Sequence, residues 1–208
     1  MSFDLWLAFA AASTALVLIP GPTVLLVLSY ALSQGKRVAV ASATGVALGD
    51  LIAMSLSLAG LGALVLASAT LFTVLKWVGA AYLIYLGLKL LRSPPSEGLD
   101  AMGAQSVTGG GVFWHAAAVT ALNPKSIAFF IAFVPQFIVV GQPILPQFTI
   151  LIATFVGIAT LNALAYALLA DRLRQTIKKP RVITWFTRGG GVALIGMGVM
   201  TALIRRQA

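Results

Sequence analysis

Two helix-breaking motifs inside apolar runs are the residues of this sequence best suited to bind a ligand. Pro20-Gly21-Pro22 interrupts the uncharged run from Leu5 to Leu32, and Asn123-Pro124-Lys125 interrupts a second run over 112–140. A helix in lipid keeps its backbone N–H and C=O groups bonded internally, so breakers at mid-membrane expose polar backbone there. Paired breaks in the two halves of a chain indicate a transporter binding site.

Each motif also has the residue order of a helix start. Gly21-Pro22 and Asn123-Pro124 place an N-cap residue before a proline suited to the first helical position. The N–H groups and positive dipole end of such a start bind carboxylates and other anions. The alternative is a pair of proline kinks without a ligand. The predicted substrate-binding site comprises Pro20, Gly21, Pro22, Thr23, Asn123, Pro124, Lys125 and Ser126, with Asp50 and Asn162 from neighbouring spans.

Asp50 is the only carboxylate deep within any expected span, which makes it a candidate ammonium ligand and proton carrier. An ionised acid at mid-membrane costs about 3 kcal/mol on insertion scales, so it should face a wet cavity or a partner. Burial also favours the protonated form of a carboxyl group, as proton exchange requires. The alternatives are a structural ion pair and a hydrogen-bonded neutral acid.

Lys125 is expected to pair either with Asp50 or with a substrate carboxylate at similar depth. If its span begins later than drawn, Lys125 extends instead toward the membrane interface. Asn162 is a weaker candidate, which alternatively forms a hydrogen bond across helices. Apolar side chains of the cavity would set selectivity, and the candidates for them are Met54, Phe129 and Phe133.

Composition defines the elements that position these residues. A mean hydropathy of +1.00 with only 9% charged residues excludes a soluble domain of 208 residues, which needs far more surface charge. Runs of roughly 20 apolar residues cross a bilayer. Six are predicted here, over 5–33, 39–66, 70–91, 112–140, 144–170 and 185–204, so the expected fold is an all-α polytopic membrane protein with broken first and fourth helices.

The halves of the chain resemble each other span by span. Residues 45–50, Gly-Val-Ala-Leu-Gly-Asp, resemble residues 157–162, Gly-Ile-Ala-Thr-Leu-Asn, while Gly79 and Gly87 have the spacing of Gly190 and Gly198. A three-span unit enters the membrane from the opposite side when it is repeated, which gives an inverted repeat. The alternative is chance, since glycine and proline are common in membrane helices. We therefore predict one membrane domain, 1–208, with repeat one at 1–92, a cytoplasmic linker at 93–111 and repeat two at 112–208.

Basic residues gather in alternate connections, and their positions predict orientation. The connections near 67–70 and 141–147 carry no Lys or Arg, so the positive-inside rule places both termini outside, with Arg205 and Arg206 as the exception. This distribution accounts for the net charge of +9 without a nucleic-acid partner. The basic connections carry Lys36, Arg37, Lys89, Arg92, Arg172, Arg174, Lys178, Lys179 and Arg181.

The sequence lacks the residues that several classes of function require. There is no cysteine, and a single histidine is poor material for a transition-metal site. No phosphate-binding glycine loop is present, so a nucleotide-driven pump is not expected. No catalytic set lies within the spans, so we expect neither an enzyme nor a cofactor. Transport energy would then come from an ion gradient.

Longer motifs relate the chain to a known family. The Pro-Gly-Pro at 20–22, Gly-x-x-x-Gly-Asp at 45–50, Gly-Ala-Ala-Tyr-Leu-x-Tyr-Leu-Gly at 79–87, Asn-Pro-Lys-Ser at 123–126 and Val-Pro-Gln-Phe at 134–137 are similar to those of the lysine-exporter (LysE) family. The likeness is greatest to its branch of threonine, homoserine and leucine efflux proteins (RhtB). The resemblance implies a bacterial inner-membrane exporter of amino acids or close derivatives, with inward proton flow.

The resulting hypothesis is a secondary exporter with alternating access. The two half-helix starts and Lys125 would hold the substrate carboxylate, while Asp50 would hold the ammonium group until a proton displaces it. Two alternatives remain: a membrane-embedded assembly protein without transport, and a metal-ion exporter of the same architecture, which needs more ligands than Asp50 and Asn162 supply. The particular solute and the oligomeric state, with a homo-oligomer possible, stay open.

Overall fold

The protein is a bundle of long helices with two short half-helix pairs in its interior. The computed structural model describes residues 1–19, 21–34, 36–67, 69–92, 108–139, 141–177 and 180–203, and these contain helices and no strand. The elements are α1 (Phe3–Leu18), α2 (Pro22–Gln34), α3 (Lys36–Ala67), α4 (Ala69–Arg92), α5 (Gly109–Ala121), α6 (Pro124–Ala132), the 3₁₀ helix η1 (Val134–Phe137), α7 (Ile144–Ile177) and α8 (Pro180–Leu203).

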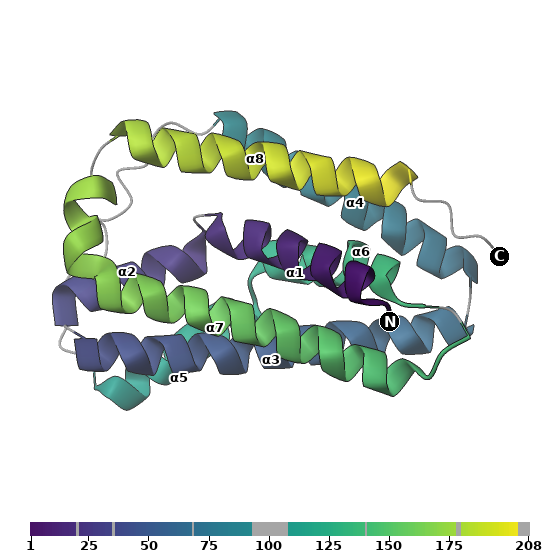
Figure 1. The fold of residues 1–208 in the computed structure, drawn as a ribbon, viewed down its shortest axis with the longest axis horizontal. Helices are drawn as coiled ribbons and strands as arrows, with labels where there is room; N and C mark the ends of the chain where they lie inside the picture. Colours follow the sequence, from purple (N-terminus) through teal and green to yellow (C-terminus); the bar gives the residue numbers. More distant parts are fainter. Residues whose placement is uncertain are drawn as a thin grey trace.

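The helices lie roughly along one axis, and their ends define two ends of the bundle. In Figure 1 the start of α1 and the end of α8 lie at the right, together with the end of α3 and the start of α7. The starts of α3, α5 and α8 lie at the left, where the basic connections of the sequence are found. We call the right the terminal end of the bundle and the left the basic end.

Helix lengths agree with a membrane protein. By length and composition α3, α4 and α7 each contain a segment able to cross a bilayer, and α1 with α2 and α5 with α6 raise the number to five if each bent pair is one span. The sixth expected span, in α8, is not among these candidates. Among the described segments, α7 continues to Ile177 rather than ending at 170, and α8 begins at Pro180 rather than 185.

The two predicted breaks are present. The axis turns by 57° between α1 and α2 and by 45° between α5 and α6. Asn123 is the N-cap of α6, with Pro124 at the first helical position, as expected. At the first break α2 begins at Pro22, and the carbonyl of Gly21 accepts the N–H of Leu25, which is the bond of an N-cap residue.

The predicted boundary of the linker is wrong at its C-terminal end. Thr108 is the N-cap of α5, and its hydroxyl accepts the N–H of Gly111, so Gly109 to Gly111 form the first turn of this helix. A Thr N-cap compensates for the low helix propensity of the glycines. The remainder of the predicted linker, 93–107, lies outside the described residues.

Small residues allow close contact between helices of the two halves. A methyl group on Gly49 of α3 would lie 2.6 Å from the Ala117 carbonyl of α5, and one on Gly45 would overlap the Phe113 carbonyl. The sequence motif Gly45-x-x-x-Gly49 therefore packs α3 directly against the α5 backbone. Because Asp50 follows Gly49, this contact also fixes its position beside the second broken pair.

Two apolar clusters flank the breaks and differ in composition. The cluster toward the terminal end contains six buried phenylalanines from α1, α6, η1 and α7, namely Phe9, Phe129, Phe130, Phe133, Phe137 and Phe155. The cluster toward the basic end, from α2, α3, α5 and α7, contains buried Ala, Val and Leu but no buried aromatic residue. We call them the phenylalanine cluster and the alanine cluster, after residues such as Ala163, Ala167 and Ala170.

Candidate functional site

A pocket lies where the two breaks meet. It offers about 30 Å³ of free space, which is room for only one or two water molecules. Its polar side chains come from α2, α3, α6 and α7, and its apolar walls join the phenylalanine and alanine clusters. The lining residues include seven predicted from the sequence: Gly21, Thr23, Asp50, Asn123, Lys125, Ser126 and Asn162.

The other predicted residues shape the breaks without lining the pocket. Pro22 and Pro124 begin α2 and α6, and neither is a lining residue. Proline at a helix start fixes the backbone φ angle and lacks the N–H that would otherwise be unpaired. Pro20 lies outside the described residues.

Asn123 connects the two breaks through hydrogen bonds. Its Oδ1 accepts the N–H of Lys125 at 3.0 Å, which caps α6, and its Nδ2 donates to Oγ1 of Thr23 at 3.2 Å. Thr23 Oγ1 also lies 3.4 Å from Oγ1 of Thr120 in α5. Asn123 is only 3% exposed, so losing these partners would leave a buried amide unsatisfied. This network holds the starts of α2 and α6 together.

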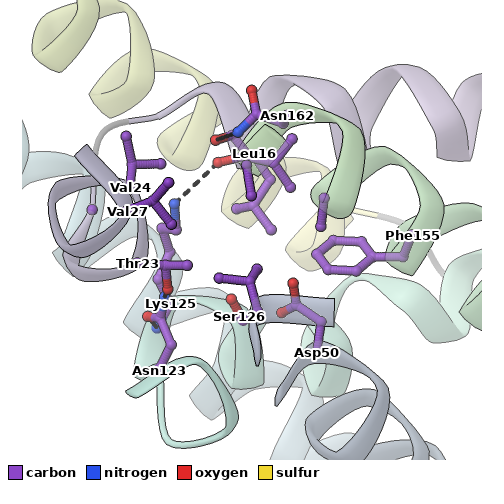
Figure 2. A pocket seen from close by; sticks show the side chains of 15 residues that line it. Leu16, Thr23, Val24, Val27, Asp50, Asn123, Lys125, Ser126, Phe155 and Asn162 are labelled. Carbon is purple, nitrogen blue, oxygen red and sulfur yellow. Dashed lines mark hydrogen bonds between the residues drawn. The ribbon is translucent and has the colours of Figure 1, made fainter. Parts of the chain in front are cut away.

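Lys125 reaches across the pocket to the C-terminal end of α1. Its Nζ donates to the carbonyl oxygens of Leu16, at 3.1 Å, and Ile19, at 3.0 Å. The Leu16 carbonyl also accepts the backbone N–H of the C-cap residue Ile19 at 3.2 Å. Carbonyls at the end of a helix carry partial negative charge, which a cation stabilises. The side chain is half-buried and points into the break (Figure 2), so the alternative that it extends toward the membrane interface is wrong.

Asp50 occupies a different side of the same pocket. Its side chain is 4% exposed, and among the described residues nothing donates a hydrogen bond to it or forms an ion pair with it. The direct pair of Asp50 and Lys125 considered from the sequence is therefore not formed, and Figure 2 shows the two side chains apart in the same pocket. A carboxylate buried without a partner is costly. Its position in a pocket therefore makes Asp50 a candidate site for a cationic ligand or a proton.

Asn162 combines the two roles considered for it. Its Nδ2 donates to the carbonyl of Val17 at 3.1 Å, which is a hydrogen bond across helices α7 and α1, and the residue also lines the pocket. Lys125 and Asn162 thus supply donors to three carbonyls at the end of α1. Sequence reasoning missed this feature because it considered the N–H groups of the half-helix that starts at each break, but not the carbonyls of the half-helix that ends there.

The apolar lining also differs from the prediction. Met54, Phe129 and Phe133 are buried in the phenylalanine cluster and do not line the pocket. The aromatic residue that does line it is Phe155 of α7. Position along an apolar helix does not reveal which face meets a cavity, because every face carries similar residues. The other apolar lining residues are Leu16, Val17, Val24, Val27, Val46, Ala159 and Ala163.

Comparison with known proteins decides the family. Residues 14–204 match the family model described as a LysE type translocator. The chain belongs to the LysE family. This agrees with the resemblance found in the motifs, and it makes the protein a membrane translocator rather than an assembly protein of unrelated type.

The relatives of this LysE-family translocator include named efflux proteins. It is 37% identical over 205 residues to the homoserine/homoserine lactone efflux protein of Salmonella typhimurium, covering 99% of each chain. It is 34% identical over 155 residues to the leucine efflux protein of Salmonella choleraesuis, covering 74% of this chain and 73% of the relative. An uncharacterized membrane protein of Vibrio cholerae is 32% identical over 202 residues. No solved structure matches the chain significantly.

The chemistry of the pocket fits a zwitterion. It presents a carboxylate, an ammonium group, two amides and two hydroxyls within an apolar surround. Within the described ranges, no three His, Cys, Asp or Glu side chains come together as metal ligands. Charged groups of both signs in one small pocket are suited to a ligand that also carries both signs.

Proposed function

We propose that this LysE-family translocator exports a small amino acid or a close derivative from the cytoplasm, in exchange for protons, by alternating access. The observation that carries the proposal is the pocket at the meeting of the two breaks, lined by Asp50, Lys125, Asn123 and Asn162. The names of the relatives, which refer to homoserine, homoserine lactone and leucine, support the amino-acid class.

Helix pairing supports an inverted repeat of α1–α4 and α5–α8. In each half the long helix after the broken pair packs on the broken pair of the other half: α3 contacts α5 and α6, and α7 contacts α1 and α2. Two further pairs, α3 with α7 and α4 with α8, each join equivalent helices. A pseudo-two-fold axis relates contacts in this way.

Equivalent glycines in α4 and α8 have equivalent surroundings, which supports the same repeat. Gly79 meets Ala132 of the second broken pair, and Gly190 meets Ile19 of the first. About two helical turns farther along each helix, the next pair of equivalent glycines joins α4 to α8. Gly87 meets α8 at Gly191, and Gly198 meets α4 at Ala80 and Ile84. Reciprocal contacts of this kind support a repeat over a chance placement of glycines.

Each end of a zwitterionic substrate has a partner of opposite polarity in the pocket. We assign the substrate ammonium group to Asp50, which is buried and unpartnered in the described conformation. The carboxylate is assigned to the N-terminal ends of α2 and α6, with hydroxyls of Thr23 and Ser126 beside them. Lys125 contributes positive charge to the same wall once its bonds to α1 are released.

Competition between the proton and the substrate for Asp50 couples proton entry to amino-acid export. A proton and a substrate ammonium group cannot both neutralise one carboxylate, so protonation from outside releases substrate and deprotonation toward the cytoplasm restores the site. With about 30 Å³ of free space, the described pocket is too small for an amino acid, so the helices must separate during the cycle. We assign the basic end of the bundle to the cytoplasm and both termini to the outside of a bacterial inner membrane.

The test is transport in proteoliposomes with an imposed pH gradient. Asp50→Asn keeps the shape of the side chain but holds no charge, so we expect loss of gradient-driven amino-acid flux. Asp4→Asn removes an exposed carboxylate in the first turn of α1 and should transport as the unmodified protein does. Equal, pH-coupled flux by Asp50→Asn and the unmodified protein would falsify the coupling role. Absence of flux from the unmodified protein for any amino acid refutes the export proposal.

A further inference from the structure

The C-terminal end of α1 holds a cationic group that belongs to the other half of the chain. Lys125 is 109 positions from Leu16 in sequence, and its ammonium group donates to the Leu16 and Ile19 carbonyls across the pocket. In other broken-helix transporters, exposed carbonyls at such half-helix ends coordinate coupling cations. Here a side chain occupies the place of the ion.

The groups around Lys125 Nζ form a defined binding site for an ammonium group. A methyl group on Gly21 would lie 3.4 Å from Nζ, so the break approaches the ammonium group closely with backbone alone. Asn162 donates to the neighbouring Val17 carbonyl, while Nζ donates to the Ile19 carbonyl and shares the Leu16 carbonyl with the Ile19 N–H. Asp50 is buried, has no hydrogen-bond or ion-pair partner among the described residues, lines the same pocket and offsets the positive charge at longer range.

We propose that the end of α1 is a binding site for one primary ammonium group, and that Lys125 fills it as a tethered cation bridging the two halves. The ligand class follows from the geometry: two carbonyl oxygens accept two N–H groups, while the third ammonium proton faces the pocket. A quaternary ammonium ion has no N–H to donate and is excluded.

This arrangement has a consequence for transport that rests on the proposed function. Because Lys125 lies on α6 and the carbonyls lie on α1, the bridge breaks whenever the two broken pairs separate. The tethered ammonium group replaces the metal cation that would otherwise neutralise these carbonyls. We therefore expect export by the unmodified protein to be unchanged when Na⁺ is replaced by choline, and a requirement for Na⁺ would contradict the inference.

The direct test is chemical replacement of the missing group. Lys125→Ala removes the ammonium donor from both carbonyls and vacates space, although the Ile19 N–H still donates to the Leu16 carbonyl. Methylammonium is a small organic probe that restores both ammonium donors. In thermal unfolding of the purified full-length variant, methylammonium at ten times its dissociation constant should raise the midpoint by about 3 °C. The unmodified protein, whose site is filled, should not respond.

Three controls isolate the site. Tetramethylammonium should leave Lys125→Ala unchanged, because it matches the charge but not the donors. Lys125→Met fills the vacated space with an apolar chain and should give no response to methylammonium. Asn162→Ala removes an uncharged donor from the adjacent Val17 carbonyl and should also give none. A response of equal size in any control, or none in Lys125→Ala, overturns the proposal.

A second variant and a second readout keep the outcomes distinct. If Lys125→Ala does not accumulate, Lys125→Ser, which vacates the same space behind a short side chain, is titrated instead, and a flat titration again overturns the site. Export by Lys125→Ala should fall at least about tenfold and recover partly with methylammonium, as expected for losing a charged hydrogen-bonding group. Should the unmodified protein export no amino acid, the proposed function fails, whereas the thermal titration still decides the ammonium site.

Discussion

The phenylalanine cluster and the alanine cluster lie on opposite sides of one pocket and are packed in different ways. Toward the terminal end, rings interlock with centroids 4.7 Å apart for Phe130 and Phe155 and 5.2 Å for Phe9 and Phe137. Toward the basic end, Ala43, Ala116 and Ala167 let helices approach with little side chain between them. We infer that the pocket is closed firmly toward the terminal end and opens more readily toward the basic end.

The reason is the amount of side chain that must move. Separating the phenylalanine cluster exposes large rings that contact one another across α1, α6, η1 and α7, and each buried ring contributes several kcal/mol. Separating the alanine cluster exposes mainly aliphatic groups of Ala, Val and Leu, with the half-buried Tyr30 and Tyr166 beside them. Aliphatic groups contribute about 0.8 kcal/mol for each buried CH₂. The same helices thus form a thick barrier on one side and a thin one on the other.

Removing a central ring of the phenylalanine cluster should have the largest effect on the difference in packing between the two clusters. Phe129→Ala deletes a fully buried ring that contacts Phe9, Phe130, Phe133 and Phe155, and we expect destabilisation of about 3–5 kcal/mol. Unfolding in detergent measures it against Phe3→Ala, a residue that is 70% exposed. Equal losses in the two variants would show that the cluster does not hold the terminal end closed.

The close contact of α3 with α5 beside the alanine cluster provides a smaller test. Gly49→Ala forces a methyl group against the Ala117 carbonyl, so we expect about 1–3 kcal/mol of destabilisation. Gly60→Ala lies on the same helix with no atom within 4 Å of the added methyl group, and should stabilise by up to about 1 kcal/mol. Thermal unfolding of both variants measures the contrast, and a stabilising Gly49→Ala would contradict close packing of α3 on α5.

The smallest expected effect is on selectivity. Phe155 lines the pocket at the edge of the phenylalanine cluster, so Phe155→Leu enlarges the pocket while keeping this wall apolar. We expect a shift of at most about tenfold toward larger apolar amino acids. The loss of stability should be smaller than that caused by Phe129→Ala, because Leu retains part of the buried apolar volume. Competition between homoserine and leucine in the export assay measures the shift. An unchanged preference would remove Phe155 from the substrate contact surface.

Local sequence rules predicted the parts of the site that local chemistry controls. N-cap residues followed by proline predicted the starts of α2 and α6, and the repeat alignment placed Asp50 and Asn162 on the helices that face those starts. Glycine spacing predicted close helix contacts, and each such contact is formed between helices of opposite halves or equivalent position. These predictions succeed because helix starts and small-residue contacts depend on few neighbouring residues.

The partner of Lys125 and the aromatic lining required the tertiary structure. Lys125 was expected to meet an acid, yet it lies on backbone carbonyls that no residue type in the sequence reveals. Phe155 lines the pocket while Phe129 and Phe133 do not, because helix rotation decides which ring faces the cavity. The boundary at Gly109 was missed since three glycines usually indicate a turn rather than a capped helix.

Side-resolved labelling tests the central claim most directly, and the absence of cysteine makes it clean. Ala159 and Ala163 lie one turn apart on α7, both line the pocket, and both are 4% exposed, but Ala159 belongs to the phenylalanine cluster and Ala163 to the alanine cluster. With a charged thiol reagent added on the side of the basic connections, Ala163→Cys should react faster than Ala159→Cys, and a transported amino acid should slow both. Faster reaction from the opposite side, or no protection by any amino acid, would contradict a substrate pocket gated by these two clusters.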